Sequence, residues 1–192
     1  MFPGSFGQRC PLRYHVVALT LTTALCAVSA TMVGCADSTG PYTWGSVESN
    51  ITASFPDIPR ITTTELATFF DDPTLEVTLL DVREAEEFAV SHLLGAVRVS
   101  SVEQAAALIA AAPEHTTIIA YCSVGYRSAA LVTGLREHST RRVYNLKGSL
   151  FRWVNENRPV YRGTDRVDEV HPFNDSWGAL LDSHRHANEP SP

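Results

Sequence analysis

Cys122 has the sequence surroundings of a reactive residue. It opens the stretch "CSVGYRS" (122–128), between the apolar run "TTIIAY" and a run with helical spacing that begins "RSAALV". A strand that turns directly into a helix leaves backbone N–H groups without partners at the positive end of the helix dipole. Such a turn binds anions. A cysteine at its base is therefore favoured as the thiolate, which is the nucleophilic form.

The residues after Cys122 indicate which chemistry this turn could support. Gly125 allows the backbone to curl so that several N–H groups point inward, and we expect the helix to begin at Arg127 or Ser128. A persulfide is anionic at its terminal sulfur, so the same turn would stabilise one. The alternative is that Cys122 is a small core residue at a strand end. The glycine, arginine and serine behind it favour sulfur transfer.

Three motifs, in order along the chain, resemble those of single-domain rhodaneses, a family of sulfurtransferases. The stretch "DVREAEEFAVSHLLGAV" (81–97) is similar to the N-terminal signature, and "CSVGYRS" is similar to the active loop. "VYNLKGSLFRWVNENRPV" (143–160) is similar to the C-terminal signature, although Ser149 replaces its second glycine. The resemblance covers residues 58–162 and implies a rhodanese-like α/β fold.

The resemblance also implies roles for the matching residues. Cys122 would take sulfane sulfur from a thiosulfate-like donor and give it to a thiol or to cyanide through a persulfide, without a cofactor or a metal. Arg127 could attract a dianionic donor. Asp81 and Arg83 would brace the site, or form an ion pair without a part in the chemistry. The persulfide would be held by the backbone N–H groups of Ser123, Val124, Gly125, Tyr126, Arg127 and Ser128.

Two other functions stay open. One is a membrane-tethered persulfide carrier or binding module that serves a partner protein, because a lone cysteine suits both carrier and enzyme. The other is a phosphatase. The spacing from Cys122 to Arg127 is C-x4-R, one residue shorter than the C-x5-R of the related phosphatases. The tighter loop fits a sulfur atom better than a phosphoryl group.

The segments that would position this turn alternate between strand and helix. This order predicts a central parallel sheet of about five strands with helices on both faces. In such sheets the reactive groups collect beyond the carboxyl ends of the strands, where Cys122 stands. Apolar, β-branched runs predict strands at 75–82, 96–100, 116–122 and 141–146, and helical spacing predicts helices at 61–70, 84–93, 100–113, 127–138 and 148–159.

Residues on either side of the alternating part are more polar. Residues 36–57 are rich in Ser, Thr, Gly, Pro and Asn without an apolar period, so we expect a flexible spacer. The tail at 163–192 carries one apolar patch, "HPFNDSWGALL" (171–181). We expect Trp177, Leu180 and Leu181 to pack back on the domain, with a flexible or partner-docking tail as the alternative.

Residues 1–35 have the form of an export signal. They combine a basic start, an uncharged apolar run from Val16 to Val33 and no acidic residue. "MVGC", ending at Cys35, resembles the bacterial lipobox, which implies a lipidated Cys35 and a membrane anchor. A cut after Ala30 would instead release a secreted soluble protein, and an uncleaved anchor is also open. On all three alternatives we expect an exported protein, periplasmic or at the cell surface.

The composition narrows the class of protein further. A chain of 192 residues suits one ordinary domain, and we expect a monomer. The net charge of −6 and the scattered distribution of its 15 Lys and Arg residues exclude a nucleic-acid binder. Cys10, Cys26 and Cys35 all fall in the leader. Cys122 is therefore expected to lack a disulfide partner in the folded part.

Overall fold

The structure is a computed structural model that describes residues 42–187. The expected leader with Cys35, the beginning of the expected spacer and the last residues of the tail lie outside this range. The described residues belong to one compact unit. In this part of the chain, no helix is long and apolar enough to cross a membrane.

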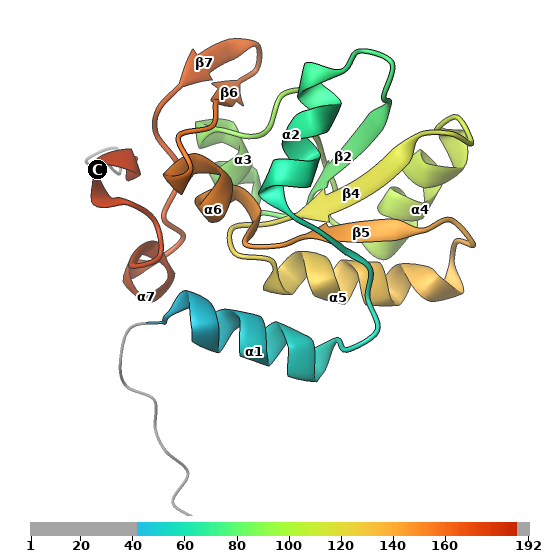
Figure 1. Ribbon diagram of the computed structural model, residues 1–192, viewed down its shortest axis with the longest axis horizontal. Coiled ribbons are helices and arrows are strands. Elements are labelled where there is room, and N and C mark those ends of the chain that lie inside the picture. Colours follow the sequence, from blue (N-terminus) through green and yellow to red (C-terminus); the bar gives the residue numbers. More distant parts are fainter. Residues whose placement is uncertain (1–41, 188–192) are drawn as a thin grey trace, which may run out of the picture. The chain divides into compact units, whose positions relative to one another are not determined.

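Five parallel strands form the central sheet, in the order β1-β5-β4-β2-β3 (Figure 1). This confirms the predicted fold class. β4 pairs with β2 on one side and β5 on the other, so it is central, and its last four residues are buried. Cys122 directly follows this strand. The strands are β1 (Arg60–Ile61), β2 (Val77–Asp81), β3 (Val97–Arg98), β4 (Thr117–Tyr121) and β5 (Val143–Leu146).

Helices cover both faces of the sheet, as predicted (Figure 1). Right-handed crossovers place α2 and α3 on one face and α4 and α5 on the other. α6 packs beside α2, and a short 3-10 turn at Leu135–Glu137 extends α5. The helices are α2 (Thr63–Asp71), α3 (Ala85–Val90), α4 (Val102–Ala111), α5 (Tyr126–Gly134) and α6 (Ser149–Asn155).

The expectation of a flexible spacer is wrong for residues 44–54, which form helix α1 (Trp44–Ser54). Thr43 caps this helix in a reciprocal pair of hydrogen bonds with Ser46. Only Val47 and Ile51 are buried, one turn apart, and the rest of the helix is largely polar. Such a narrow apolar stripe is easily overlooked among serines, threonines and asparagines.

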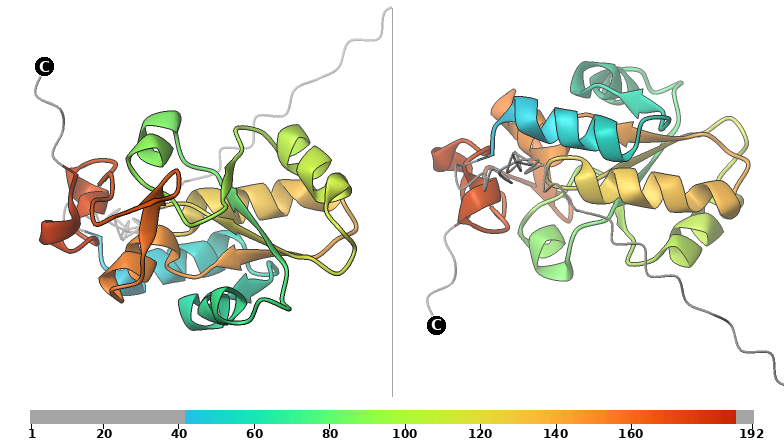
Figure 2. Two further views of the ribbon diagram at one scale, coloured as in Figure 1. Left: turned by 90° about the horizontal axis from the view of Figure 1, so that it is seen from above. Right: turned by 90° about the horizontal axis from the view of Figure 1, so that it is seen from below.

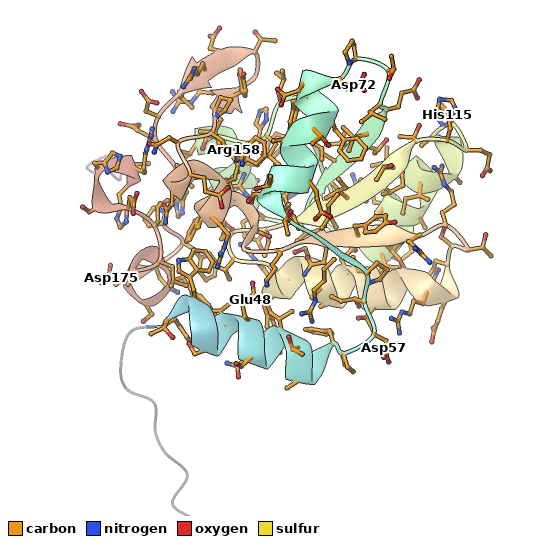
Figure 3. All side chains as sticks on the ribbon, in the orientation of Figure 1. Glu48, Asp57, Asp72, His115, Arg158 and Asp175 are labelled. Carbon is orange, nitrogen blue, oxygen red and sulfur yellow. The ribbon has the colours of Figure 1, made fainter. Side chains whose placement is uncertain are left out.

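α1 runs beside α5 in the same direction (Figure 2). Two polar contacts tie α1 and the segment after it to the rest of the domain, and both start from residues labelled in Figure 3. The Glu48 carboxylate lies 3.6 Å from Lys147 Nζ, and the backbone carbonyl of Asp57 accepts a hydrogen bond of 2.6 Å from Arg136. The N-terminal ends of α1 and α5 therefore lie on the same side of the domain.

The tail packs on the domain after a small antiparallel hairpin. Leu180 and Leu181 are buried in the core, and Trp177 packs against it. α7 lies next to the N-terminal ends of α1 and α5 (Figures 1 and 2). The elements of this part are β6 (Val160–Arg162), β7 (Asp165–Val167), α7 (Asp175–Gly178) and a 3-10 turn at Ser183–Arg185.

Candidate active site

Cys122 lies at the base of the turn between β4 and α5, with 1% of its surface exposed. The backbone N–H of Gly125 donates a hydrogen bond of 3.1 Å to its Sγ. Gly125 has φ +110, a conformation that residues with a Cβ rarely adopt. The expected curl of the backbone is therefore present, and it brings a donor to the sulfur.

Further N–H groups of the turn are free to bind an anion. Within residues 42–187, the backbone N–H groups of Ser123, Val124, Tyr126, Arg127 and Ser128 have no hydrogen-bond acceptor. α5 begins at Tyr126 with Gly125 as its cap, one or two residues earlier than expected. The unpaired donors of its first turn therefore belong to the loop itself, at the positive end of the helix dipole.

Two buried polar side chains hold the turn in place, Asn145 from β5 and Ser149 from the first turn of α6. Asn145 donates to the carbonyl of Gly125 at 3.0 Å and accepts from the hydroxyl of Ser128 at 2.6 Å. Ser149 accepts the backbone N–H of Cys122 at 3.2 Å. Ser149 has φ +48, so the backbone keeps the conformation that suits a glycine while the hydroxyl adds a hydrogen bond.

Arg127 is paired with a buried carboxylate. Its Nη1 and Nη2 lie 2.7 and 2.8 Å from the two oxygens of Glu87, and the hydroxyl of Ser123 donates to the same carboxylate at 2.8 Å. Burial alone would raise the pKa of Glu87, but the hydrogen bonds from Arg127, Ser123 and the backbone of Glu84 hold that pKa below its ordinary value. The positive charge of Arg127 is therefore compensated within the site.

A cavity of about 150 Å³ opens over Cys122. Two of its walls come from the tail, since Phe173 and Trp177 line it together with the turn. The ring of Phe173 lies over Arg127, with 4.8 Å from the ring centre to Cζ. The full lining consists of Cys122, Ser123, Val124, Tyr126, Arg127, Phe173 and Trp177. Of the predicted binding residues, Gly125 and Ser128 do not line the cavity. They contact the sulfur through the backbone N–H of Gly125 at 3.1 Å and the hydroxyl of Ser128 at 3.7 Å.

Asp81 and Arg83 form a fully buried ion pair of 2.7 Å away from this cavity. Arg83 also donates to the carbonyl of Ser91 at 2.6 Å, so the pair joins the end of β2 to the end of α3. Burial opposes the charge of Arg83, but the Asp81 carboxylate raises the pKa of the guanidinium above its ordinary value. Neither side chain hydrogen-bonds to the turn, so the structure places the pair beside the site.

Several residues that build the site were not predicted. Glu87 and Asn145 lay within the quoted motifs, where a lone polar residue in an apolar setting is a signal for a buried network. Ser149 was noted only as a departure from glycine, and Trp177 only as a packing residue. Phe173 lay within the apolar patch at 171–181, but its contact with the turn could not be predicted because it depends on where the tail folds.

The rhodanese-like domain family matches the chain at residues 62–156. This segment is a rhodanese-like domain. It contains the turn, Glu87, Asn145 and Ser149, whereas α1 and the tail lie outside the match. No curated protein matches the sequence.

Several solved structures are similar to this chain. Thiosulfate sulfurtransferase from Pseudomonas aeruginosa has a TM-score of 0.53 and 20% identity, over 61% of this chain and 22% of that one. A rhodanese-related protein from Thermoplasma volcanium has a TM-score of 0.45 and 21% identity, over 54% of this chain and 98% of that one. A rhodanese-like domain protein from Staphylococcus aureus has a TM-score of 0.43 and 24% identity, over 50% of this chain and 91% of that one.

Proposed function

We propose that this protein is a rhodanese-type sulfurtransferase in which Cys122 carries sulfane sulfur as a persulfide. The observation that carries the proposal is the geometry around Sγ. The sulfur is buried, accepts the N–H of Gly125 at 3.1 Å, and stands at the start of a helix whose first N–H groups have no acceptor in the described residues. This arrangement stabilises an anionic sulfur.

The reaction has two half-reactions. The Cys122 thiolate attacks the outer sulfur of thiosulfate, the S–S bond of the donor breaks, and sulfite leaves with the electron pair. The enzyme then holds Cys122–S–S⁻. Cyanide or a thiolate attacks the terminal sulfur, giving thiocyanate or a new persulfide and returning the Cys122 thiolate. The backbone donors of the turn would bind the negative sulfur in both states.

Two observations bear on the alternative functions. A carrier that docks its partner through the tail needs an exposed apolar patch, but Leu180 and Leu181 are buried, and Phe173, which is 42% exposed, covers Arg127. The related phosphatases have a C-x5-R loop around the phosphoryl group, whereas this turn is C-x4-R and its Arg127 is paired with both oxygens of Glu87. Both observations favour the sulfurtransferase.

Mass spectrometry after incubation with thiosulfate tests the proposal. We expect a mass gain of one sulfur atom on the peptide that contains Cys122, reversed by cyanide with release of thiocyanate. Cys122→Ser should abolish both, even though it keeps the three cysteines of the leader. An unmodified Cys122 would contradict the proposal, and so would a phosphatase rate that depends on Cys122.

Export is a separate proposal that rests on the leader sequence alone. We propose that the protein is exported and held at a membrane through a lipidated Cys35. Mass spectrometry of the mature N-terminus distinguishes an acylated Cys35 from a free start at Thr31 and from an intact leader. An intact, unmodified leader in a soluble fraction would contradict export.

A further inference from the structure

We propose that the cavity over Cys122 selects organic sulfane-sulfur donors, in which the transferable sulfur is attached to a monoanionic group that carries an apolar substituent. Phe173 and Trp177 are the specificity-determining residues. This inference rests on the proposed function and names the substrate class of the same site. Both residues belong to the tail, outside the segment that matches the rhodanese-like domain family.

The charges around the cavity favour a donor with a single negative charge. Among the residues that line it, Arg127 is the one with a charged side chain. Its guanidinium is already engaged by both oxygens of Glu87 and is covered by the ring of Phe173. The backbone N–H groups of the turn remain to bind an anion, and they suit the negative charge on the transferred sulfur. The second charge of a dianion such as thiosulfate has no cation of its own.

The walls of the cavity favour an apolar substituent. Phe173, Trp177 and Tyr126 supply aromatic surface directly above the turn. Trp177 and Tyr126 also line a second cavity of about 410 Å³ on the side of α1. The two rings therefore present aromatic surface to both cavities. Aromatic side chains bind planar apolar groups through stacking and burial of surface.

The backbone of the tail is held in an unfavourable conformation at the residue that covers Arg127. Phe173 has φ +69, in the left-handed region, which costs a non-glycine residue about 1 kcal/mol. Its N–H donates to the ring of His171 at 3.0 Å, and Asn174 caps α7 by accepting the N–H of Trp177 at 3.1 Å. These contacts place both rings over the turn, although Phe173 is 42% exposed. Strain that is retained in this way is typical of functional positions.

Benzenethiosulfonate is a suitable probe of this class. The Cys122 thiolate attacks its outer sulfur, the S–S bond breaks, and benzenesulfinate leaves with the electron pair. The products are the persulfide and a monoanion, so charge and atoms balance as they do with thiosulfate. Methanethiosulfonate has the same charge and the same reacting group without the ring, so it controls for intrinsic reactivity.

The experiment compares kcat/KM for the three donors in the wild type, with cyanide as the acceptor. We expect benzenethiosulfonate to exceed methanethiosulfonate by about tenfold, as stacking and burial of one ring predict. Trp177→Ala and Phe173→Ala should each remove most of that advantage, because they lower kcat/KM for benzenethiosulfonate several-fold more than for methanethiosulfonate and thiosulfate. Phe70→Ala is the matched control, since Phe70 is 39% exposed and lies on α2 away from this cavity.

The outcomes separate this inference from the proposed function. If no donor loads sulfur on Cys122, the proposed function fails. If all donors load it but benzenethiosulfonate has no advantage over methanethiosulfonate, the inference alone is wrong. An equal loss for all three donors in Trp177→Ala and Phe173→Ala would also overturn it, because the rings would then act on the turn and not on the donor.

Discussion

The turn around Cys122 is held by different interactions from the two flanking segments, which are α1 with the residues before it and the tail that follows the domain. Backbone geometry and buried polar side chains hold the turn, including Asn145, which is 1% exposed. Aromatic contacts, in contrast, join the segment just before α1 to the tail and the tail to the site. Tyr42 and Trp177 stack with ring centres 3.8 Å apart, and Phe173 covers Arg127.

This difference suggests a division of tasks. The turn lies within the family match at residues 62–156, and its donors act on the sulfur that any donor molecule would deliver. The flanking segments lie outside the match. They contribute aromatic surface that would contact the substituent of a donor and not its transferred sulfur. We therefore expect changes in the turn to affect stability and every donor alike, and changes in the flanks to affect the choice among donors.

Glu87→Gln should have the largest effect on stability. The carboxylate of Glu87 is 2% exposed and receives hydrogen bonds from Arg127 and Ser123. Removing its charge leaves Arg127 without a counterion. Because the carboxylate is buried but Arg127 is 31% exposed, we expect a loss at the low end for buried pairs, about 3 kcal/mol of the free energy of unfolding. Urea denaturation at pH 7 measures this. A loss as small as that of an exposed ion pair would show that the network contributes little.

The same variant gives a pH signature. The pKa of Glu87 is lowered in the folded protein, so its contribution to stability is fully present above its ordinary pKa of 4.5 and is lost as the pH falls through the folded value. The difference in unfolding free energy between wild type and Glu87→Gln should therefore be constant from pH 7 to 5.5 and shrink below about 4.5. A difference independent of pH would rule out the charge as its source.

Gly125→Ala should have the next largest effect. Gly125 has φ +110, and an added Cβ would lie 3.4 Å from Ile51 Cδ1 and from the carbonyl oxygen of Leu146. The backbone strain should lower the free energy of unfolding by about 2 kcal/mol and slow persulfide formation with every donor. Gly95→Ala is the control, because Gly95 has φ +73 and open space around it. Gly95→Ala should lower the free energy of unfolding by about 1 kcal/mol and leave the rate of persulfide formation unchanged.

Ser149 offers a smaller and more specific test of the turn. Ser149→Ala removes the hydroxyl that accepts the N–H of Cys122, which should lower the free energy of unfolding by about 1 kcal/mol. Ser149→Gly removes the same hydroxyl but relieves the strain at φ +48. We expect the glycine variant to be the more stable of the two, with equally slowed loading of sulfur. The reverse order of stability would show that the backbone at 149 is not strained.

The sheet and the turn could be predicted from the sequence because their signals are local. Apolar, β-branched runs predict the strands, and "CSVGYRS" between strand and helix predicts an anion-binding turn at the carboxyl end of the sheet. The helix α1 was missed because its buried stripe consists of two residues, Val47 and Ile51. The polar composition of this segment predicted a spacer, and the spacing of Val47 and Ile51 indicates a helix only when their contact with α5 is known.

The rest of the site could not be predicted because it depends on contacts between distant segments. Ser128 was expected at the start of the helix, but the partner of its hydroxyl, Asn145, is known only when β4 and β5 are paired. Arg127 was expected to attract a donor, and only the folded chain shows that Glu87 neutralises it. Phe173 contacts the turn from a tail that follows the domain.

Tyr42→Ala should have the smallest effect on stability and the most selective effect on activity. Tyr42 is 38% exposed, and its stacking on Trp177 contributes at most about 1 kcal/mol. Without it, Trp177 is less firmly held between the two cavities, so kcat/KM for benzenethiosulfonate should fall about twofold to threefold. Thiosulfate should be unaffected, and Tyr42→Phe should behave as the wild type because it keeps the ring. Equal losses for both donors would mean that the flanks support the turn itself, and the division between chemistry and selection would not hold.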